Sequence, residues 1–116
     1  MKATELRIGN LVEETHSGEF GKVDMVVLSI IERMSNHSYR PIPLTEEWLV
    51  RFGFEWMDEI AGYVDGDHCV FISHGGDCWF HPFCTNDKDC HIKIRYVHTL
   101  QNLCYSLTGE ELELKP

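Results

Sequence analysis

The strongest constraint on the fold is a change of hydrophobic period near the end of this 116-residue chain. From Ile92 to Tyr96, apolar residues alternate with Lys93 and Arg95, which predicts a strand with one buried face. Apolar residues then recur at helical steps of three and four, up to a cap at Gly109. This stripe consists of Val97, Leu100, Leu103, Cys104 and Leu107. A lone helix of about three turns is marginal in water, so the stripe must pack on a sheet formed earlier in the chain.

A shorter helix with both ends marked is predicted after the Pro-Ile-Pro segment, residues 41–43. Thr45 is a suitable N-cap, and the two glutamates that follow it favour the positive end of the helix dipole. Gly53 suits the C-terminal cap, with Phe54 folding back on Leu49 as in a Schellman motif. The sequence therefore predicts a complete short helix in the middle of the chain.

The segment before this helix is predicted to form a small antiparallel β unit. Residues 6–12 predict a short strand interrupted by Gly9 and Asn10. Residues 22–33 are rich in Val, Ile, Met and Leu, which favours a strand, or two strands bent near Ser29. The apolar residues are spread so evenly there that a helix remains an alternative.

The segment after the short helix has the turn signals of a β-meander. Asp65-Gly66 and Gly75-Gly76 are hairpin dipeptides, and they separate the strands predicted at residues 63–64, 67–73 and 78–83. We therefore expect a single α+β domain over residues 1–116, with the β unit in residues 1–40. Residues 41–116 would hold the short helix, a four-stranded antiparallel meander and a C-terminal helix packed on it.

Charge and composition exclude several classes of function. Ten Lys and Arg residues against nineteen Asp and Glu residues give a net charge of −9, so a nucleic-acid partner is unlikely on electrostatic grounds. No segment is apolar enough to serve as a signal peptide or to cross a membrane, which predicts a cytoplasmic protein without a membrane partner. In that compartment the five cysteines are expected to be reduced thiols.

Three blocks of the chain carry a resemblance to a known family. They are LRIGNLV near the start, PIPLTEEWLVRFGF in the middle and IKIRYVHTLQNLCYSLTGEEL near the end. The chain resembles a family of small, uncharacterised proteins encoded by gut bacteria and their phages or other mobile elements. The resemblance implies an accessory role in mobile-element biology and brings no activity, cofactor or catalytic residue with it. The Cys- and His-rich stretch, residues 67–91, lies outside the shared blocks.

A transition-metal site in this Cys- and His-rich stretch is the alternative to a binding module. Eight cysteines and histidines fall within twenty-four residues, but none forms the Cys-x2-Cys knuckle of a zinc site. A hairpin at Gly75-Gly76 would pair Cys69 with Pro82 and leave His68 diagonal to His81, and these two histidines are the candidate metal ligands. The same residues are also ordinary half-exposed or buried strand residues, so no cofactor is required.

Aromatic residues indicate a different class of function. The residues Trp56, Tyr63, Trp79 and Phe83 are candidates for an interaction surface, because Trp and Tyr are frequent in binding hot spots. The alternative is that they form the core under the two helices. The favoured function is a non-enzymatic protein-binding or accessory module. Its expected partner is another protein, such as a basic one, or a second copy of the chain in a homodimer.

Overall fold

The computed structural model describes residues 5–34, 38–59, 62–65, 68–73, 76–82 and 92–115. The helices are α1 (Met25–Met34), α2 (Glu46–Arg51) and α3 (Val97–Thr108). The first three strands are β1 (Leu11–Glu14), β2 (Phe20–Lys22) and β3 (Tyr39–Arg40). The remaining strands are β4 (Glu55–Met57), β5 (Gly62–Asp65), β6 (His68–Ile72), β7 (Cys78–Pro82) and β8 (Ile92–Ile94).

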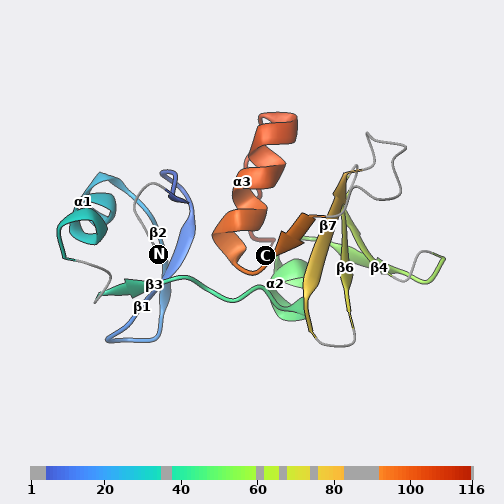
Figure 1. Ribbon diagram of the computed structural model, residues 1–116, viewed down its shortest axis with the longest axis horizontal. Coiled ribbons are helices and arrows are strands. Elements are labelled where there is room, and N and C mark those ends of the chain that lie inside the picture. The colour runs from blue at the N-terminus through green and yellow to red at the C-terminus, as the bar shows by residue number, and fades with distance from the viewer. Residues whose placement is uncertain are drawn as a thin grey trace.

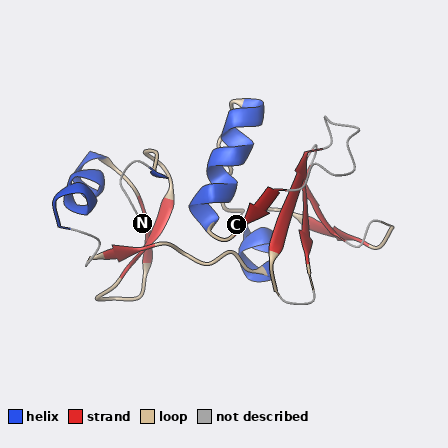
Figure 2. Cartoon of the chain, in the orientation of Figure 1, coloured by secondary structure: helices blue, strands red, loops and turns tan. Residues whose placement is uncertain are grey.

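The strands form two antiparallel sheets at opposite ends of an elongated molecule, with α3 between them (Figure 1, Figure 2). The N-terminal unit, residues 5–40, holds a sheet of order β2-β1-β3 and helix α1. The C-terminal unit, residues 41–115, holds the meander β4-β5-β6-β7-β8 with α2 and α3. The predicted α+β fold class is confirmed, although the meander has five strands where the turn signals predicted four.

The strand favoured for residues 22–33 is wrong, and the helical alternative is right. The carboxylate of Asp24 accepts a hydrogen bond from the backbone N–H of Val27 at 2.8 Å, which caps the first turn of α1. Ile31 is buried, and Val27 and Leu28 pack beside it on the small core of the N-terminal unit. Packing on one face and an N-cap together outweigh the β propensity of the branched residues.

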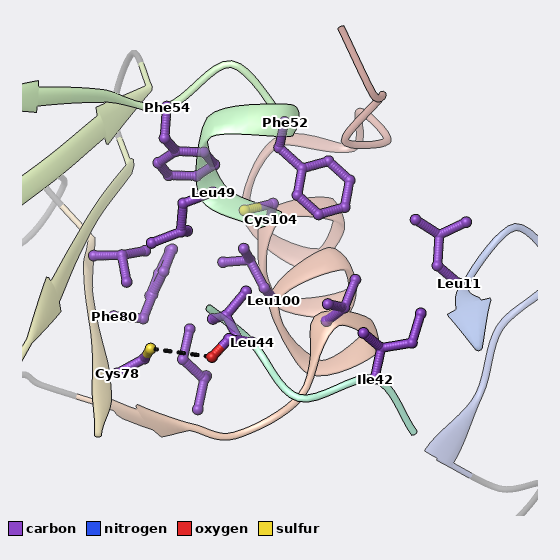
Figure 3. Packing of buried hydrophobic residues seen from close by; sticks show 13 residues of the cluster. Leu11, Ile42, Leu44, Leu49, Phe52, Phe54, Cys78, Phe80, Leu100 and Cys104 are labelled. Carbon is purple, nitrogen blue, oxygen red and sulfur yellow. Dashed lines mark hydrogen bonds between the residues drawn. The ribbon is translucent and has the colours of Figure 1, made fainter. Parts of the chain in front are cut away.

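Helix α2 ends as the sequence predicted. Gly53 has a positive φ of 91°, and its N–H donates to the carbonyl of Val50 at 2.9 Å. The N–H of Phe54 donates to the carbonyl of Leu49 at 3.0 Å, which completes a Schellman motif. Thr45 occupies the N-cap position, but its side chain makes no capping hydrogen bond. The Schellman motif directs Phe54 into the core above Leu49, as Figure 3 shows.

The large core lies between α2, α3 and the inner face of the meander (Figure 3). Its thirteen buried residues include the fully buried Leu49, Val70, Phe80 and Leu100. Helix α3 supplies most of its predicted stripe to this core and ends at Gly109 with a φ of 74°, as expected. Leu107 departs from the prediction, because it lies beyond the core with 48% of its surface exposed.

A polar network attaches the N-terminal unit to α3. The side-chain carbonyl of Gln101 accepts the backbone N–H of Leu11 at 2.8 Å, and Asn10 donates to Asn102 at 2.9 Å. Arg7 donates to the Asn102 side chain at 2.8 Å and to both carboxylate oxygens of Glu111, at 2.9 and 3.0 Å. Asn10 and Gln101 are buried, so these bonds satisfy polar groups that water does not reach.

The three sequence blocks that carried the family resemblance meet around α3. The first block supplies Arg7 and Asn10 to the polar network, and the last block supplies Gln101. The middle block joins the last one through Leu44, whose N–H donates to the carbonyl of Arg95 at 2.9 Å. The first and last blocks therefore supply the polar contacts between the two units, whereas the contact of the middle block lies within the C-terminal unit. Within the described residues, no helix is both long and apolar enough to cross a membrane.

Candidate functional site

The strand register separates the two candidate metal ligands. The β6–β7 hairpin pairs Cys69 with His81 and His68 with Pro82, one residue away from the predicted register. Because residues directly opposite share a face, His68 and His81 lie on opposite faces of the sheet. The predicted register is therefore wrong by one residue, and in the observed register His68 and His81 do not share a face on which they could bind one ion. The cause is the longer turn that the strands leave between Ile72 and Cys78.

No metal centre forms elsewhere in the part of the chain that the structure describes. Among those residues, no three His, Cys, Asp or Glu side chains come close enough together to hold an ion. The segment 83–91 of the Cys- and His-rich stretch lies outside the described residues, as does His74. Metal binding by that part of the stretch stays a prediction.

The described cysteines are structural thiols. Cys69, Cys78 and Cys104 are free and buried. Burial raises the pKa of Cys69 to about 11 and the pKa of Cys104 to about 12. Burial, followed by the carboxylates of Asp77 and Glu46, also raises the pKa of Cys78. Because the thiolate is the nucleophile, none of these three groups is activated for catalysis at neutral pH.

The structure brings together two of the four candidate interaction residues. Trp56 on β4 lies directly opposite Tyr63 on β5, with ring centroids 5.2 Å apart and an interplanar angle of 70°. Trp79 on β7 faces the other side of the sheet, beside Phe71 and Lys93. The ammonium of Lys93 lies 5.9 Å from the Trp79 ring centroid and forms an ion pair with Asp77 at 3.4 Å. Phe83 lies outside the described residues.

The Trp56–Tyr63 pair is held in a fixed geometry by polar contacts. The indole N–H of Trp56 donates to the Asp58 carboxylate at 2.6 Å. The phenol of Tyr63 hydrogen-bonds to Glu46 of α2. Burial, and then the charge and hydrogen bond of Glu46, raise the pKa of Tyr63, so the phenol stays protonated at neutral pH. Trp56 nevertheless leaves 51% of its surface exposed, which makes it a rigid and accessible aromatic side chain.

Trp56 lies on an open edge of the five-stranded sheet. Strand β4 is the outermost strand beside β5, and the described residues include no further strand paired with it. All three of its residues are exposed, and Met57 adds a second apolar side chain with 43% exposure. Three exposed acidic residues, Glu55, Asp58 and Glu59, flank Trp56 and Met57 along the chain. An unpaired strand edge offers backbone hydrogen bonds to another extended chain.

This edge was the part of the site that sequence patterns missed. The segment Glu55–Met57 is only three residues long, which is too short to show the alternation of apolar and polar residues that predicts a strand. The segment becomes a strand because it pairs with β5, in which Gly62 lies opposite Met57. A weak signal existed in Trp56 and Met57, two adjacent large apolar residues among acids directly after a helix cap.

Comparison with known proteins gives no further guidance about the site. Searches of family models, curated proteins and solved structures found no match to this chain. The relationship to phage and mobile-element proteins therefore stays a prediction.

Proposed function

We propose that this protein is a non-enzymatic binding module that captures an extended, basic segment of a protein partner along β4. The observation that carries the proposal is the exposed Trp56, packed edge-to-face against Tyr63 at the open edge of the sheet. Partner strands that add to such an edge gain main-chain hydrogen bonds, while side-chain pockets and aromatic anchors provide the specificity.

The short length of β4 limits how much of the binding free energy backbone hydrogen bonds can supply. Three residues offer few backbone hydrogen bonds, so most of the binding free energy has to come from burying Trp56 and Met57. The acidic rim formed by Glu55, Asp58 and Glu59 favours Lys and Arg in the partner and opposes a second copy of a chain with a net charge of −9. We place this interaction in the cytoplasm, which agrees with the free thiols.

The experiment is a fluorescence-anisotropy titration with a labelled ten-residue peptide of alternating Lys and Val. We expect Trp56→Ala to weaken binding of the peptide roughly tenfold or more, as expected for a hot-spot aromatic residue. Met25→Ala is the matched control, because Met25 is also an exposed apolar residue, with 69% exposure, but lies on α1. This control should bind within about twofold of the unchanged protein.

Two further ligands test the mode of binding. A peptide with alternate backbone nitrogens methylated cannot pair with a strand edge and should lose binding, although its side chains are unchanged. A peptide of alternating Glu and Val should not bind. Equal binding of the unchanged protein and Trp56→Ala, or of the basic and acidic peptides, contradicts the proposal. A dimeric mass that Trp56→Ala abolishes would assign the edge to a second copy instead.

A further inference from the structure

Two pairs of aromatic rings in this molecule have nearly the same geometry. Phe20 and Trp48 have ring centroids 5.1 Å apart and an interplanar angle of 80°. For Trp56 and Tyr63 the corresponding values are 5.2 Å and 70°. In both pairs the edge of one ring meets the face of the other, so two steeply inclined rings form a corner. We name them the Phe20–Trp48 corner and the Trp56–Tyr63 corner.

The Phe20–Trp48 corner holds a guanidinium group from the chain itself. The Cζ atom of Arg51 lies 4.8 Å from the Phe20 ring centroid and 4.5 Å from the Trp48 ring centroid. Both distances are within the limit of about 6 Å for a cation–π interaction. A guanidinium group suits this position because it is planar, weakly hydrated and able to stack on aromatic rings. The molecule therefore shows which side chain an aromatic corner of this geometry accommodates.

The Trp56–Tyr63 corner is accessible from outside the molecule. Trp56 lies on the outermost strand and is 51% exposed, so an external group can reach its ring. Tyr63 is the inner wall, because it pairs with Trp56 on one side and with Val70 of β6 on the other. The cation–π contacts found among the described residues involve other rings. Any cation over this corner must therefore come from another molecule or from the part of the chain that the structure does not describe.

Two carboxylates add negative charge at the Trp56–Tyr63 corner. The indole N–H of Trp56 donates to the Asp58 carboxylate at 2.6 Å, and the phenol of Tyr63 hydrogen-bonds to Glu46. Neither acid takes part in the ion pairs formed within the described ranges. A cation placed over the rings would meet the negative faces of the aromatic systems as well as these two charges. The corner is therefore complementary in charge to a cationic side chain.

We propose that the Trp56–Tyr63 corner binds an arginine side chain of the partner and thereby selects arginine over lysine. The selection rests on the proposed capture of an extended segment along β4. A strand added to the open edge places one of its residues opposite Trp56 and on the same face of the sheet. The guanidinium of that residue lies over the corner as that of Arg51 lies over Phe20 and Trp48. Lysine fits less well, because its compact ammonium is strongly hydrated and does not stack.

Two ten-residue peptides test this selection by fluorescence anisotropy, one of alternating Lys and Val and one of alternating Arg and Val. Their charge, length and apolar residues are equal, so the ratio of the two dissociation constants isolates what the guanidinium groups add. The unchanged protein should bind the Arg peptide about threefold to tenfold more tightly. Trp56→Leu keeps an apolar side chain but removes the ring, and should bind the two peptides within about twofold of each other.

Trp79→Leu is the matched control for the ring. It replaces a tryptophan on the opposite face of the sheet and should keep the preference for the Arg peptide. Circular dichroism verifies that both variants are folded. Because the measured quantity is a ratio for one protein, a general loss of affinity in a variant does not imitate a loss of selection.

A second measurement does not require a peptide to pair with β4. Here N-acetylarginine amide and N-acetyllysine amide are titrated while NMR follows the indole N–H resonances of the three tryptophans. The arginine derivative should shift the Trp56 resonance more than that of Trp48, whose ring already carries Arg51, and more than that of Trp79. The lysine derivative should shift the Trp56 resonance less than the arginine derivative does.

The outcomes separate the corner from the strand edge. Equal affinity of the unchanged protein for both peptides overturns arginine selection but leaves capture along β4 intact. A preference for Arg that persists in Trp56→Leu also overturns it, because the preference then belongs to the acidic residues. If neither peptide binds, capture along β4 fails, and a selective shift of Trp56 by the arginine derivative still supports the corner. Absence of that shift, or equal shifts of all three tryptophans, overturns the corner as well.

Discussion

The two units of the molecule differ in how much apolar surface stabilises them. The large core buries thirteen residues, of which twelve, among them Phe52, Phe80 and Leu100, belong to the C-terminal unit and one, Leu11, comes from β1. The small core of the N-terminal unit buries four, which are Leu6, Val12, Val23 and Ile31. Each fully buried side chain of this kind contributes about 1.5–3 kcal/mol. The difference indicates that most of the hydrophobic stabilisation lies in the large core, and that the N-terminal unit depends on what it is attached to.

The attachment is mostly polar, and this determines its behaviour. Gln101, Asn10 and Arg7 fix the N-terminal unit by directional bonds that require correct geometry at several points. Each such bond contributes about 1 kcal/mol when made, but a buried partner left unpaired costs more. We therefore expect the attachment to fail cooperatively, and the N-terminal unit to open before the C-terminal unit does.

The largest expected effect comes from the large core. Phe80→Ala removes a fully buried ring from the inner face of β7 and should lower the free energy of unfolding by about 3–5 kcal/mol. Urea unfolding followed by circular dichroism measures this loss. The control Val26→Ala truncates a residue that is 67% exposed on α1 and should change stability by less than about 0.5 kcal/mol. A loss of under about 1 kcal/mol in Phe80→Ala would show that this core does not dominate stability.

The next effect tests the polar attachment. Gln101→Ala leaves the buried N–H of Leu11 unpaired and should cost about 2–3 kcal/mol. Native-state hydrogen exchange should show lost protection in β1 while the β6–β7 pairing stays protected. Ser106→Ala, an exposed change on the same helix, is the control. Equal loss of protection in both sheets would mean that the units unfold together, which would end the distinction between them.

The smallest effect is a dependence of stability on pH through His98. This residue is 2% exposed, its ring stacks on Tyr96 at 5.6 Å, and its Nδ1 has no hydrogen-bond partner among the described residues. Burial lowers the pKa of His98 below its ordinary 6.5, against the opposing charge of Glu5. The unfolded chain therefore binds the proton more readily, and stability present above pH 6.5 is lost as the pH falls toward the lower folded pKa.

Replacing this histidine measures the contribution directly. His98→Gln should flatten the decline of stability below pH 6.5, where one proton accounts for at most about 1.4 kcal/mol per pH unit. Urea unfolding of both proteins at a series of pH values gives the two slopes. If both proteins lose stability equally as the pH falls, another titratable group is responsible for the loss. Loss of protection in β1 ahead of β6 at low pH would sharpen the comparison, because Glu5 belongs to the N-terminal unit.

Local signals predicted those elements whose boundaries are determined by nearby residues. The Schellman motif at Gly53 and Phe54 and the αL cap at Gly109 were both visible in the sequence, because each needs only a few consecutive residues. Helix α1 was not favoured, since its β-branched composition is overruled by packing on Leu6 and Val12, which are distant in sequence. The intrinsic secondary-structure propensity of a segment contains no information about such a contact.

The candidate sites were predicted less completely than the fold. Trp56 and Tyr63 were identified by residue type, but their contact requires the register of β4 on β5, which no sequence pattern gave. A one-residue difference in the β6–β7 register separated His68 from His81, because period two sends neighbours to opposite faces.

Strand β1 has a consequence for any attempt to dissect the protein. Leu11 is buried in the large core, and the next residue, Val12, is buried in the small one. Two successive residues of one strand therefore belong to two cores, one on each face of the strand. Cutting the gene near residue 41, where the units are joined by a connecting segment, would leave the longer fragment with a hole where Leu11 had been (Figure 3). A fragment meant to retain the binding surfaces should therefore keep β1, or receive it back as a synthetic peptide.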